Sequence, residues 1–304
     1  MSPNSVQRFH ARFLAVLEYV ESHLDDEMCV EDLAAIAAFS KFHFHRQFQS
    51  LFGMNVYRYV QLSRLKRASY QLAFRDQSVL EAAAANGYES PESFARAFRR
   101  QFLQSPSDFR SRPDWNSWAL SLDPLTDMRH RHMPTPSLPH IEIVQFPATK
   151  IALLEHRGDP LAIGESIRKF IAWRKEHRLH PSVSATFNLL YDDPEAVPAE
   201  KFRLGLAVAT ELEIADNEYG VTSSEIPRGR CAKFTAVGSE ATLATLLRQF
   251  YSQWLPQSRE EPRDFPLFLQ RLKFYPNVPE HEAVTDVYLP IDDPHARRSA
   301  RSAR

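Results

Sequence analysis

The stretch FSKFHFHRQFQSLFG at residues 39–53 is matched fifty residues later by NGYESPESFARAFRRQF at residues 86–102. Phenylalanines at every fourth position lie on one face of a helix, so each trio predicts a buried stripe. An arginine two residues after the first phenylalanine lies on the outward side of the same helix. The matching pairs are Ser40 with Ser90, Phe44 with Phe94, Arg46 with Arg96, Phe48 with Phe98 and Phe52 with Phe102.

Each matching stretch is preceded by a short alanine-rich segment, at residues 30–38 and 79–85, and by a break of a few residues. This order predicts two helix-turn-helix units. Ser40 is expected to cap the helix at 41–52, and Gly53 to end it. Ser90 with Pro91 marks the start of the second such helix. Two units with outward arginines indicate a protein that reads DNA.

Helical periodicity also predicts a covering helix at residues 8–24 and a long helix at 56–74 that joins the two units. Between residues 40 and 112 there are 12 Lys or Arg against 5 Asp or Glu, although the whole chain has a net charge of only −1. Such an excess suits contact with phosphates. From the linking helix we expect Arg64, Lys66 and Arg67 to make these contacts.

Residues 113–139 are rich in proline and show no sustained periodicity, which predicts a linker, semi-rigid in its second half. Its histidines, His130, His132 and His140, lack cysteine or acidic partners at ligand spacing, so we expect no metal site and no cofactor. The expected domain boundaries are therefore a DNA-binding domain at 8–112, the linker at 113–139, a second domain at 140–291 and a disordered basic tail at 292–304.

The second domain is predicted to be α+β and to consist of two similar halves, each of the type β-β-α-β-β. Markers recur 80 or 81 residues apart: Ala152 with Ala232, Gly158 with Gly238, Phe170 with Phe250 and Trp173 with Trp254. Expected strands are 141–146, 151–156, 185–192, 202–212, 221–226, 231–237, 265–274 and 284–289, and expected helices are 161–177 and 240–255. Ligands often bind at the seam between such halves.

Residues 8–115 resemble the DNA-binding domain of the AraC/XylS family of transcription regulators. The resemblance implies that two recognition helices enter successive major grooves, so that one monomer binds promoter half-sites about one turn of double-stranded DNA apart. It also implies RNA polymerase as a partner. The residues that carry the resemblance are FSKFHFHRQFQSLFG (39–53), YVQLSRLKRASYQL (59–72), NGYESPESFARAFRRQF (86–102) and SPSDFR (105–110).

Carried over by position, the family's base or sugar contacts fall on two sets of residues, one in each recognition helix. Arg46 and Arg96 suit a bidentate contact with guanine. Glu92 either accepts a hydrogen bond from cytosine N4 or stabilises the start of its helix, and we favour the second. The sets are Phe42, His45 and Arg46 in one groove, and Glu92, Ser93 and Arg96 in the other.

Residues 141–291 resemble the GyrI-like effector-binding domain, and the order of the two domains resembles that of Rob-like regulators. The resemblance implies a small-molecule effector, often aromatic or cationic, bound between the two halves. Where many relatives carry a pocket Glu this chain has Gln270, and Leu272 replaces a neighbouring Tyr, so a pocket without an anion is expected. The recognisable pieces are VQFPATKIALLEHRGD (144–159), YDDPEAVPAEKFRLGLAV (191–208), IPRGRCAKFTAVGS (226–239) and TDVYLPI (285–291).

The ligand site is expected to include Gln270, Tyr191, Phe268 and Trp254, although Trp254 and its counterpart Trp173 also suit a helix-to-sheet core. Two other functions compete with ligand sensing, a small-molecule hydrolase and a protein-interaction module. We expect no enzyme, because no nucleophile is paired with a base and Cys231 lies in a predicted buried strand.

The expected setting is cytoplasmic, because the chain has no secretory signal, no apolar run long enough for a membrane and only two cysteines, in different domains. The sequence thus predicts a DNA-binding transcription regulator whose second domain senses a small molecule.

Overall fold

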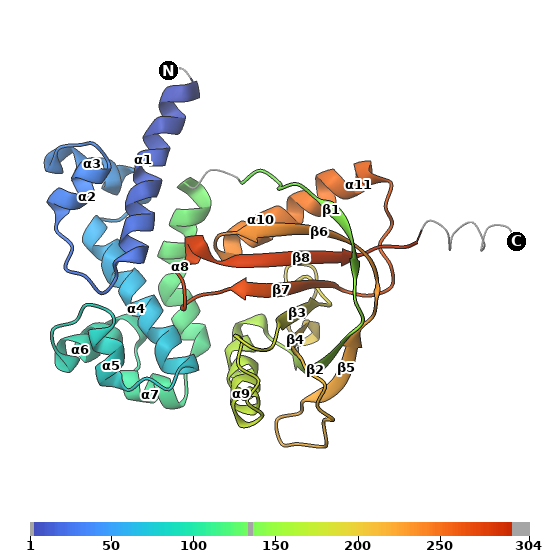
Figure 1. Cartoon of the computed structure of the whole chain (residues 1–304). Coiled ribbons are helices and arrows are strands. Elements are labelled where there is room, and N and C mark those ends of the chain that lie inside the picture. Colours follow the sequence, from blue (N-terminus) through green and yellow to red (C-terminus); the bar gives the residue numbers. More distant parts are fainter. Residues whose placement is uncertain (1–2, 133–135, 294–304) are drawn as a thin grey trace, which may run out of the picture. The chain divides into compact units, whose positions relative to one another are not determined.

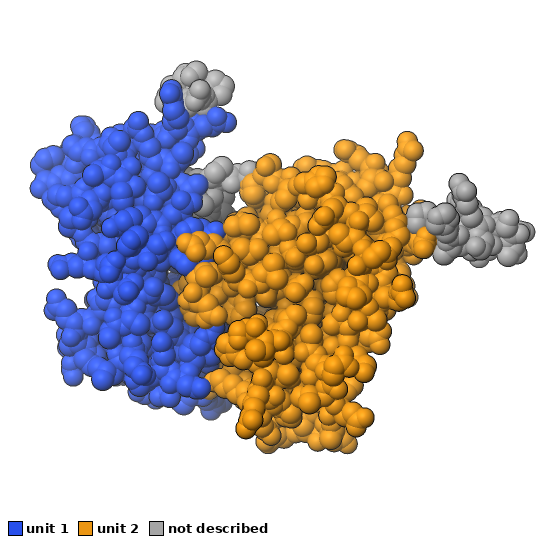
Figure 2. All heavy atoms as spheres, in the orientation of Figure 1, with its two compact units in different colours: residues 1–135, 279–281 blue, residues 136–278, 282–304 orange. Residues whose placement is uncertain are grey.

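The computed structural model describes residues 3–132 and 136–293. It divides into two compact units, coloured separately in Figure 2. Unit 1 comprises residues 1–135 and 279–281, and unit 2 comprises residues 136–278 and 282–304. Most of the predicted tail, from residue 294 onward, lies outside the described residues.

Unit 1 is helical throughout its described part (Figure 1). Among the described helices, none combines the length and the apolar character needed to cross a membrane. The helices are α1 (Pro3–Ser22), α2 (Val30–Ile36), α3 (Lys41–Phe52), α4 (Val56–Phe74), α5 (Val79–Ala84), α6 (Pro91–Phe102), α7 (Pro106–Ser111) and α8 (Trp115–His132).

The two predicted helix-turn-helix units are confirmed as α2 with α3 and α5 with α6. Each has the expected aromatic core, since Phe44 and Phe48 in α3 and Phe94 and Phe98 in α6 are fully buried. The start of α6 is capped as predicted, because the Ser90 hydroxyl accepts the Ser93 backbone N–H at 3.1 Å. Ser40 stands at the corresponding position before α3, but its side chain makes no capping hydrogen bond.

The turns inside the two units have the same geometry but different residues at one left-handed position. Ala38 has φ +55° and Gly87 has φ +67°. Each turn is closed in the same way, by Phe39 N–H to Ala34 O at 2.9 Å and by Tyr88 N–H to Ala83 O at 3.1 Å. A Cβ on Gly87 would lie 2.6 Å from an Arg64 nitrogen and 3.0 Å from the Leu24 carbonyl oxygen, so only glycine fits there.

Exchanging these residue types should therefore change stability in opposite directions. Ala38→Gly should raise the free energy of unfolding by about 0.5 kcal/mol, because it relieves a left-handed alanine on an exposed turn. Gly87→Ala should lower it by about 1 to 2 kcal/mol or more, since strain and the clash add. Urea unfolding followed by circular dichroism measures both, and equal changes in the two variants would contradict the comparison.

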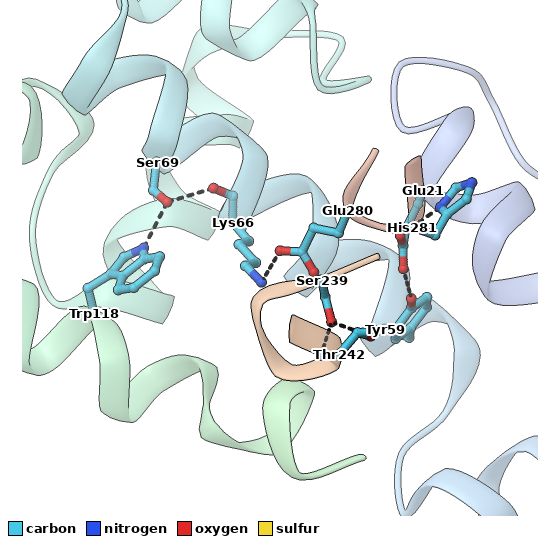
Figure 3. Close-up of polar contacts among 9 residues, drawn as sticks. All are labelled: Glu21, Tyr59, Lys66, Ser69, Trp118, Ser239, Thr242, Glu280 and His281. Carbon is cyan, nitrogen blue, oxygen red and sulfur yellow. Dashed lines mark hydrogen bonds and ion pairs between the residues drawn. The ribbon is translucent and has the colours of Figure 1, made fainter. Parts of the chain in front are cut away.

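The predicted linker is wrong for residues 115–132, which form helix α8. Asp114 caps this helix by accepting the Ser117 N–H at 3.1 Å, and the Trp118 indole N–H donates to the Ser69 hydroxyl at 2.7 Å (Figure 3). Three buried side chains one helical turn apart, Leu122, Leu125 and Met128, give it an apolar face. This packing outweighs Pro124, whose missing N–H removes one helix bond. The side chains of His130 and His132 lie outside the described residues.

Unit 2 is one antiparallel sheet of eight strands with helices on it (Figure 1). The strand order is β1-β6-β8-β7-β3-β4-β2-β5. The strands are β1 (Glu142–Phe146), β2 (Thr149–Arg157), β3 (Thr186–Leu190), β4 (Arg203–Ala209), β5 (Thr222–Ile226), β6 (Gly229–Val237), β7 (Leu267–Lys273) and β8 (Val284–Pro290). The principal helices are α9 (Ile163–Glu176), α10 (Glu240–Gln249), a π-helical turn η3 (Phe250–Trp254) and α11 (Leu255–Ser258), with short 3-10 turns η1 (Pro160–Ala162), η2 (Ala199–Lys201) and η4 (Glu280–Glu282).

The predicted duplication is confirmed by the strand order, which reads the same from both ends when β1 to β4 are matched with β5 to β8. The first strand of each half pairs with the opposite half, and β3 with β7 forms the seam. Registers match as well: Leu153 faces Ala207 in the first half, and Lys233 faces Tyr288 in the second. The sheet therefore has a pseudo-twofold relation between residues 80 or 81 apart.

The two faces of the sheet carry different cores. On one face, side chains from β2 and β4 pack with Phe170 and Trp173 of α9, and side chains from β6 and β8 pack with Leu246 of α10 and Phe250. The opposite face carries a further core, which includes aromatic residues from strands of both halves. We call it the aromatic face and define it by Phe146, Ile151, Leu153, Phe187, Leu189, Ala207, Ile226, Cys231, Phe268 and Tyr288.

Candidate nucleic-acid interface and ligand face

The outward side of α3 carries the residues predicted to read the first half-site. Arg46 is exposed, as its place opposite the phenylalanine stripe predicts. Phe42 is 73% exposed, and the Lys41 ammonium lies 5.6 Å from its ring centre. His45 is half-buried, with its ring 5.9 Å from that of Tyr57. This surface can offer one guanidinium, one imidazole and one aromatic ring to a ligand.

The outward side of α6 carries the second set. Arg96, Arg99 and Arg100 are exposed, and so is Glu92 in the first turn of the helix, where a carboxylate stabilises the exposed N–H groups. Ser93 is half-buried, and its hydroxyl donates to the Ser90 carbonyl oxygen at 2.8 Å. Arg46 and Arg96 thus hold equivalent exposed positions in the two repeats.

Two arginines of the linking helix α4 make internal hydrogen bonds. Arg64 donates to the carbonyl oxygens of Asp26 at 2.6 Å and Gly87 at 3.2 Å, and so joins the segment before α2 to the turn of the second helix-turn-helix unit. Arg67 donates to the side-chain oxygen of Asn86 at 2.8 Å and to the Ala85 carbonyl. Because three of the four acceptors belong to residues 85–87, these hydrogen bonds position the second unit against α4.

Lys66 is also engaged within unit 1. Its ammonium forms an ion pair with Glu280, which lies in the segment 279–281 (Figure 3). In the same segment His281 contacts the Glu21 carboxylate at 3.1 Å, and Glu21 accepts the Tyr59 hydroxyl at 2.9 Å. The three basic residues predicted to contact phosphate therefore all have partners inside the protein.

The aromatic face brings together the rings of four residues from both halves of unit 2. Phe268 stacks on Tyr288 with ring centres 5.0 Å apart, and Phe146 lies edge-on to both, at 4.8 and 5.1 Å. Phe187 joins them across the seam, 6.2 Å from Phe268. Of the predicted ligand residues, Phe268 belongs to this face and Tyr191 packs at its edge, half-buried.

A polar group borders these rings on β6, β7 and β8. Gln270 is two residues after Phe268 and so lies on the same face, opposite Asp286 in the strand pairing. Asp286 accepts the Thr235 hydroxyl at 2.6 Å and lies 3.2 Å from the Lys233 ammonium. Burial lowers the pKa of Lys233, but the hydrogen bonds and charges of Asp286 and Glu142 together outweigh it and leave that pKa raised. The ammonium is therefore charged at neutral pH.

Comparison with known proteins identifies both halves of the chain. Residues 139–292 match the model of the GyrI-like small molecule binding domain, and residues 33–112 match a helix-turn-helix domain. The chain belongs to the GyrI-like family. Its amino-terminal part is an AraC-type helix-turn-helix domain, as the residues of the two repeats predict.

Relatives and solved structures match separate parts of the chain. The "Probable transcriptional regulator YgiV" of Escherichia coli (strain K12) is 35% identical over 152 residues, 50% of this chain and 95% of that protein. The "Right origin-binding protein" of the same strain is 29% identical over 134 residues, 43% of this chain and 46% of that protein. A crystal structure of the DNA-binding domain of AdpA with a target DNA is 35% identical, covers 33% of this chain and 94% of its own, and has a TM-score of 0.31.

The surroundings of Trp254 do not favour ligand contact, and those of Cys231 do not favour nucleophilic catalysis. Trp254 packs with the helix-covered core, its ring stacked 5.0 Å from that of Phe250, because the π-helical turn faces that side of the sheet. We therefore leave it out of the proposed ligand site. Cys231 is fully buried, and burial raises its pKa to about 11, so its thiol stays protonated and unreactive at neutral pH.

Sequence reasoning missed the carboxylate of Asp286, which lies directly opposite Gln270 in the strand pairing. The pocket without an anion that was expected around Gln270 stays a prediction, with Asp286 and its partner Lys233 beside it. Asp286 is only 7% exposed and directly precedes Val287 in the stretch TDVYLPI. The signal that could have indicated this carboxylate is a charged residue within a strand predicted to be buried.

Proposed function

We propose that this chain regulates transcription by placing α3 and α6 in successive major grooves, under the control of a small molecule bound to its GyrI-like domain. One observation carries the DNA-binding part. The same helix, with a buried phenylalanine back and an exposed arginine front, occurs twice in one domain, at Arg46 and Arg96. A single copy of the chain thereby offers two reading helices for half-sites about one helical turn apart.

Within this proposal, base or sugar contacts belong to Phe42, His45 and Arg46 of α3, and to Ser93 and Arg96 of α6. Glu92 stabilises the start of α6, the interpretation favoured by its place in the first turn. Phosphate contacts shift from the linking helix to the exposed arginines at the end of α6, Arg99 and Arg100.

Salt dependence separates these two groups of arginines. Replacing Arg99 and Arg100 together by Gln should lower the salt slope of DNA binding by about 0.9 for each phosphate that is no longer neutralised, without changing the preferred sequence. Arg67→Gln should leave that slope unchanged and instead lower the free energy of unfolding, because its partners are internal. Titrations of a fluorescent DNA fragment at several salt concentrations measure the slopes. A lower slope in Arg67→Gln would return this residue to the DNA interface.

For the GyrI-like domain we propose an aromatic effector bound at Phe268, Tyr191 and Gln270, and no catalysis, since Cys231 is buried and protonated. RNA polymerase is the partner that regulation of a promoter requires, and we propose it on that ground. The relatives' names describe transcriptional regulators, in agreement with this function.

Selection of binding sites from a random double-stranded DNA library, with the full chain as bait, tests the proposal. We expect one enriched motif of two half-sites about 10 bp apart, bound in the presence of excess unrelated DNA. A protein-interaction module or a hydrolase would enrich no motif. The affinity of the full chain for the selected DNA is then measured with and without each member of a library of aromatic compounds. A change in affinity identifies a compound that acts through the effector domain.

A further inference from the structure

The polar end of the aromatic face encloses the ammonium of Lys233. Its nitrogen lies 3.2 Å from Asp286, 3.4 Å from Glu142 and 5.9 Å from the centre of the Tyr288 ring. The side chain of Asp286 is 10% exposed, that of Lys233 22% and that of Glu142 53%, so the group runs from the interior to the surface. Two carboxylates and one aromatic ring form the surroundings that an organic cation prefers in a protein.

The pseudo-twofold relation within the domain supplies an internal comparison. In the first half, the positions equivalent to Lys233, Tyr288 and Asp286 are Leu153, Ala207 and Gly205, held in the same strand register. That half forms the same sheet without a lysine or an aspartate at these positions, and its own carboxylate on this face, Glu155, lies at the position equivalent to Thr235 and pairs with Arg157 at 3.0 Å. Burying an ion pair costs solvation free energy that an apolar pair avoids, so the fold alone gives no reason for it.

We propose that Lys233 is a built-in occupant of a cation subsite, so that the aromatic face of this chain selects neutral aromatic ligands over cationic ones. This inference rests on the proposed function of the GyrI-like domain and names its ligand class. With Lys233 in place, Asp286 is already neutralised, and a second cation would have to expel the lysine or lie beside it. A neutral aromatic molecule meets no such cost, and Gln270 offers it both a donor and an acceptor.

Lys233→Met tests this, because methionine keeps the length of the side chain and removes the charge. The probes are trimethyl(2-naphthyl)ammonium and its uncharged isostere 2-tert-butylnaphthalene, titrated against the full chain by calorimetry. We expect Lys233→Met to bind the cation at least about tenfold more tightly than the wild type does, and the neutral probe to change less than about threefold. Adding Asp286→Asn to Lys233→Met should abolish the gain.

Two further variants keep the result interpretable. Lys150→Met removes a surface lysine of the same domain, paired with Glu211 and 66% exposed, and should change neither affinity. If Lys233→Met fails to fold, Lys233→Gln retains a hydrogen-bond donor for Asp286, and the same gain is expected.

Equal affinity of the cation for wild type and both Lys233 variants overturns the proposal, because it means that a ligand displaces the lysine at no cost. Absence of binding of both probes to every variant overturns it too. Either result is separable from failure of the proposed function, since binding of the same protein to its selected DNA is measured in parallel and does not depend on these probes.

Discussion

Arg46→Ala and Arg96→Ala should each weaken binding to the selected DNA by about 1 to 3 kcal/mol, and each should relax base preference in one half-site only. The two guanidinium groups hold equivalent, exposed positions on separate helices, above fully buried phenylalanines. Truncation therefore removes a bidentate donor and leaves the helix packing intact. Binding to a panel of DNA fragments, each with one base pair changed, measures both effects.

Arg99→Ala is the matched control for these two variants, because it removes an exposed arginine from the same helix as Arg96 but from its last turn. We expect it to weaken binding to all fragments of the panel by a similar factor. Uniform weakening by Arg46→Ala and Arg96→Ala as well would mean that they contact phosphate, and base recognition would then have to come from Phe42, His45 or Ser93.

The helices of unit 1 could be predicted closely because their signals are local. The ends of α3 and α4 agree with the sequence prediction residue for residue, because Gly53 directly follows α3 and the spacing of buried residues can be read within each segment. Helix α8 was missed because Pro124 and the neighbouring prolines suggested a linker. The sequence does show apolar residues at helical spacing, at 122, 125 and 128. That spacing stabilises a helix only because α4 packs against it and supplies the Ser69 hydroxyl for Trp118.

The partners of Arg64 and Arg67 could not be predicted from the sequence. Their acceptors are mainly backbone carbonyls of Asp26, Ala85 and Gly87, and a carbonyl group has no signature in residue identity. An arginine on an amphipathic helix near a positive surface therefore has the same appearance in a sequence whether it binds phosphate or joins two parts of the fold.

In the GyrI-like domain the duplication could be predicted, but not the face to which each residue belongs. Trp173 and Trp254 recur at equivalent positions, yet the repeat alone does not show that both turn toward the helix-covered core. The pairing of Lys233 with Asp286 was missed for a related reason. It depends on the register of β6 with β8, two strands that are far apart in the chain.

Phe98→Ala should lower the free energy of unfolding of the helix-turn-helix domain by about 3 to 5 kcal/mol. The ring is fully buried, with its centre 4.7 Å from that of Phe102 and 5.4 Å from those of Phe94 and Phe109. Removing it leaves a cavity beneath α6 that close-packed neighbours cannot fill. Hydrogen exchange of the α5 to α7 amides in the full chain measures the loss, while amides of α9 report on the unaffected domain.

Phe42→Ala is the matched control, because the same side chain is deleted from a site that is 73% exposed. Its free energy of unfolding should change by less than about 0.5 kcal/mol, whereas its affinity for the selected DNA should fall. The two phenylalanines thus separate the two functions of the repeated helix. Its buried side fixes the position of the helix, and its exposed side contacts the DNA. A small stability loss in Phe98→Ala, or unaltered DNA affinity in Phe42→Ala, would contradict that division.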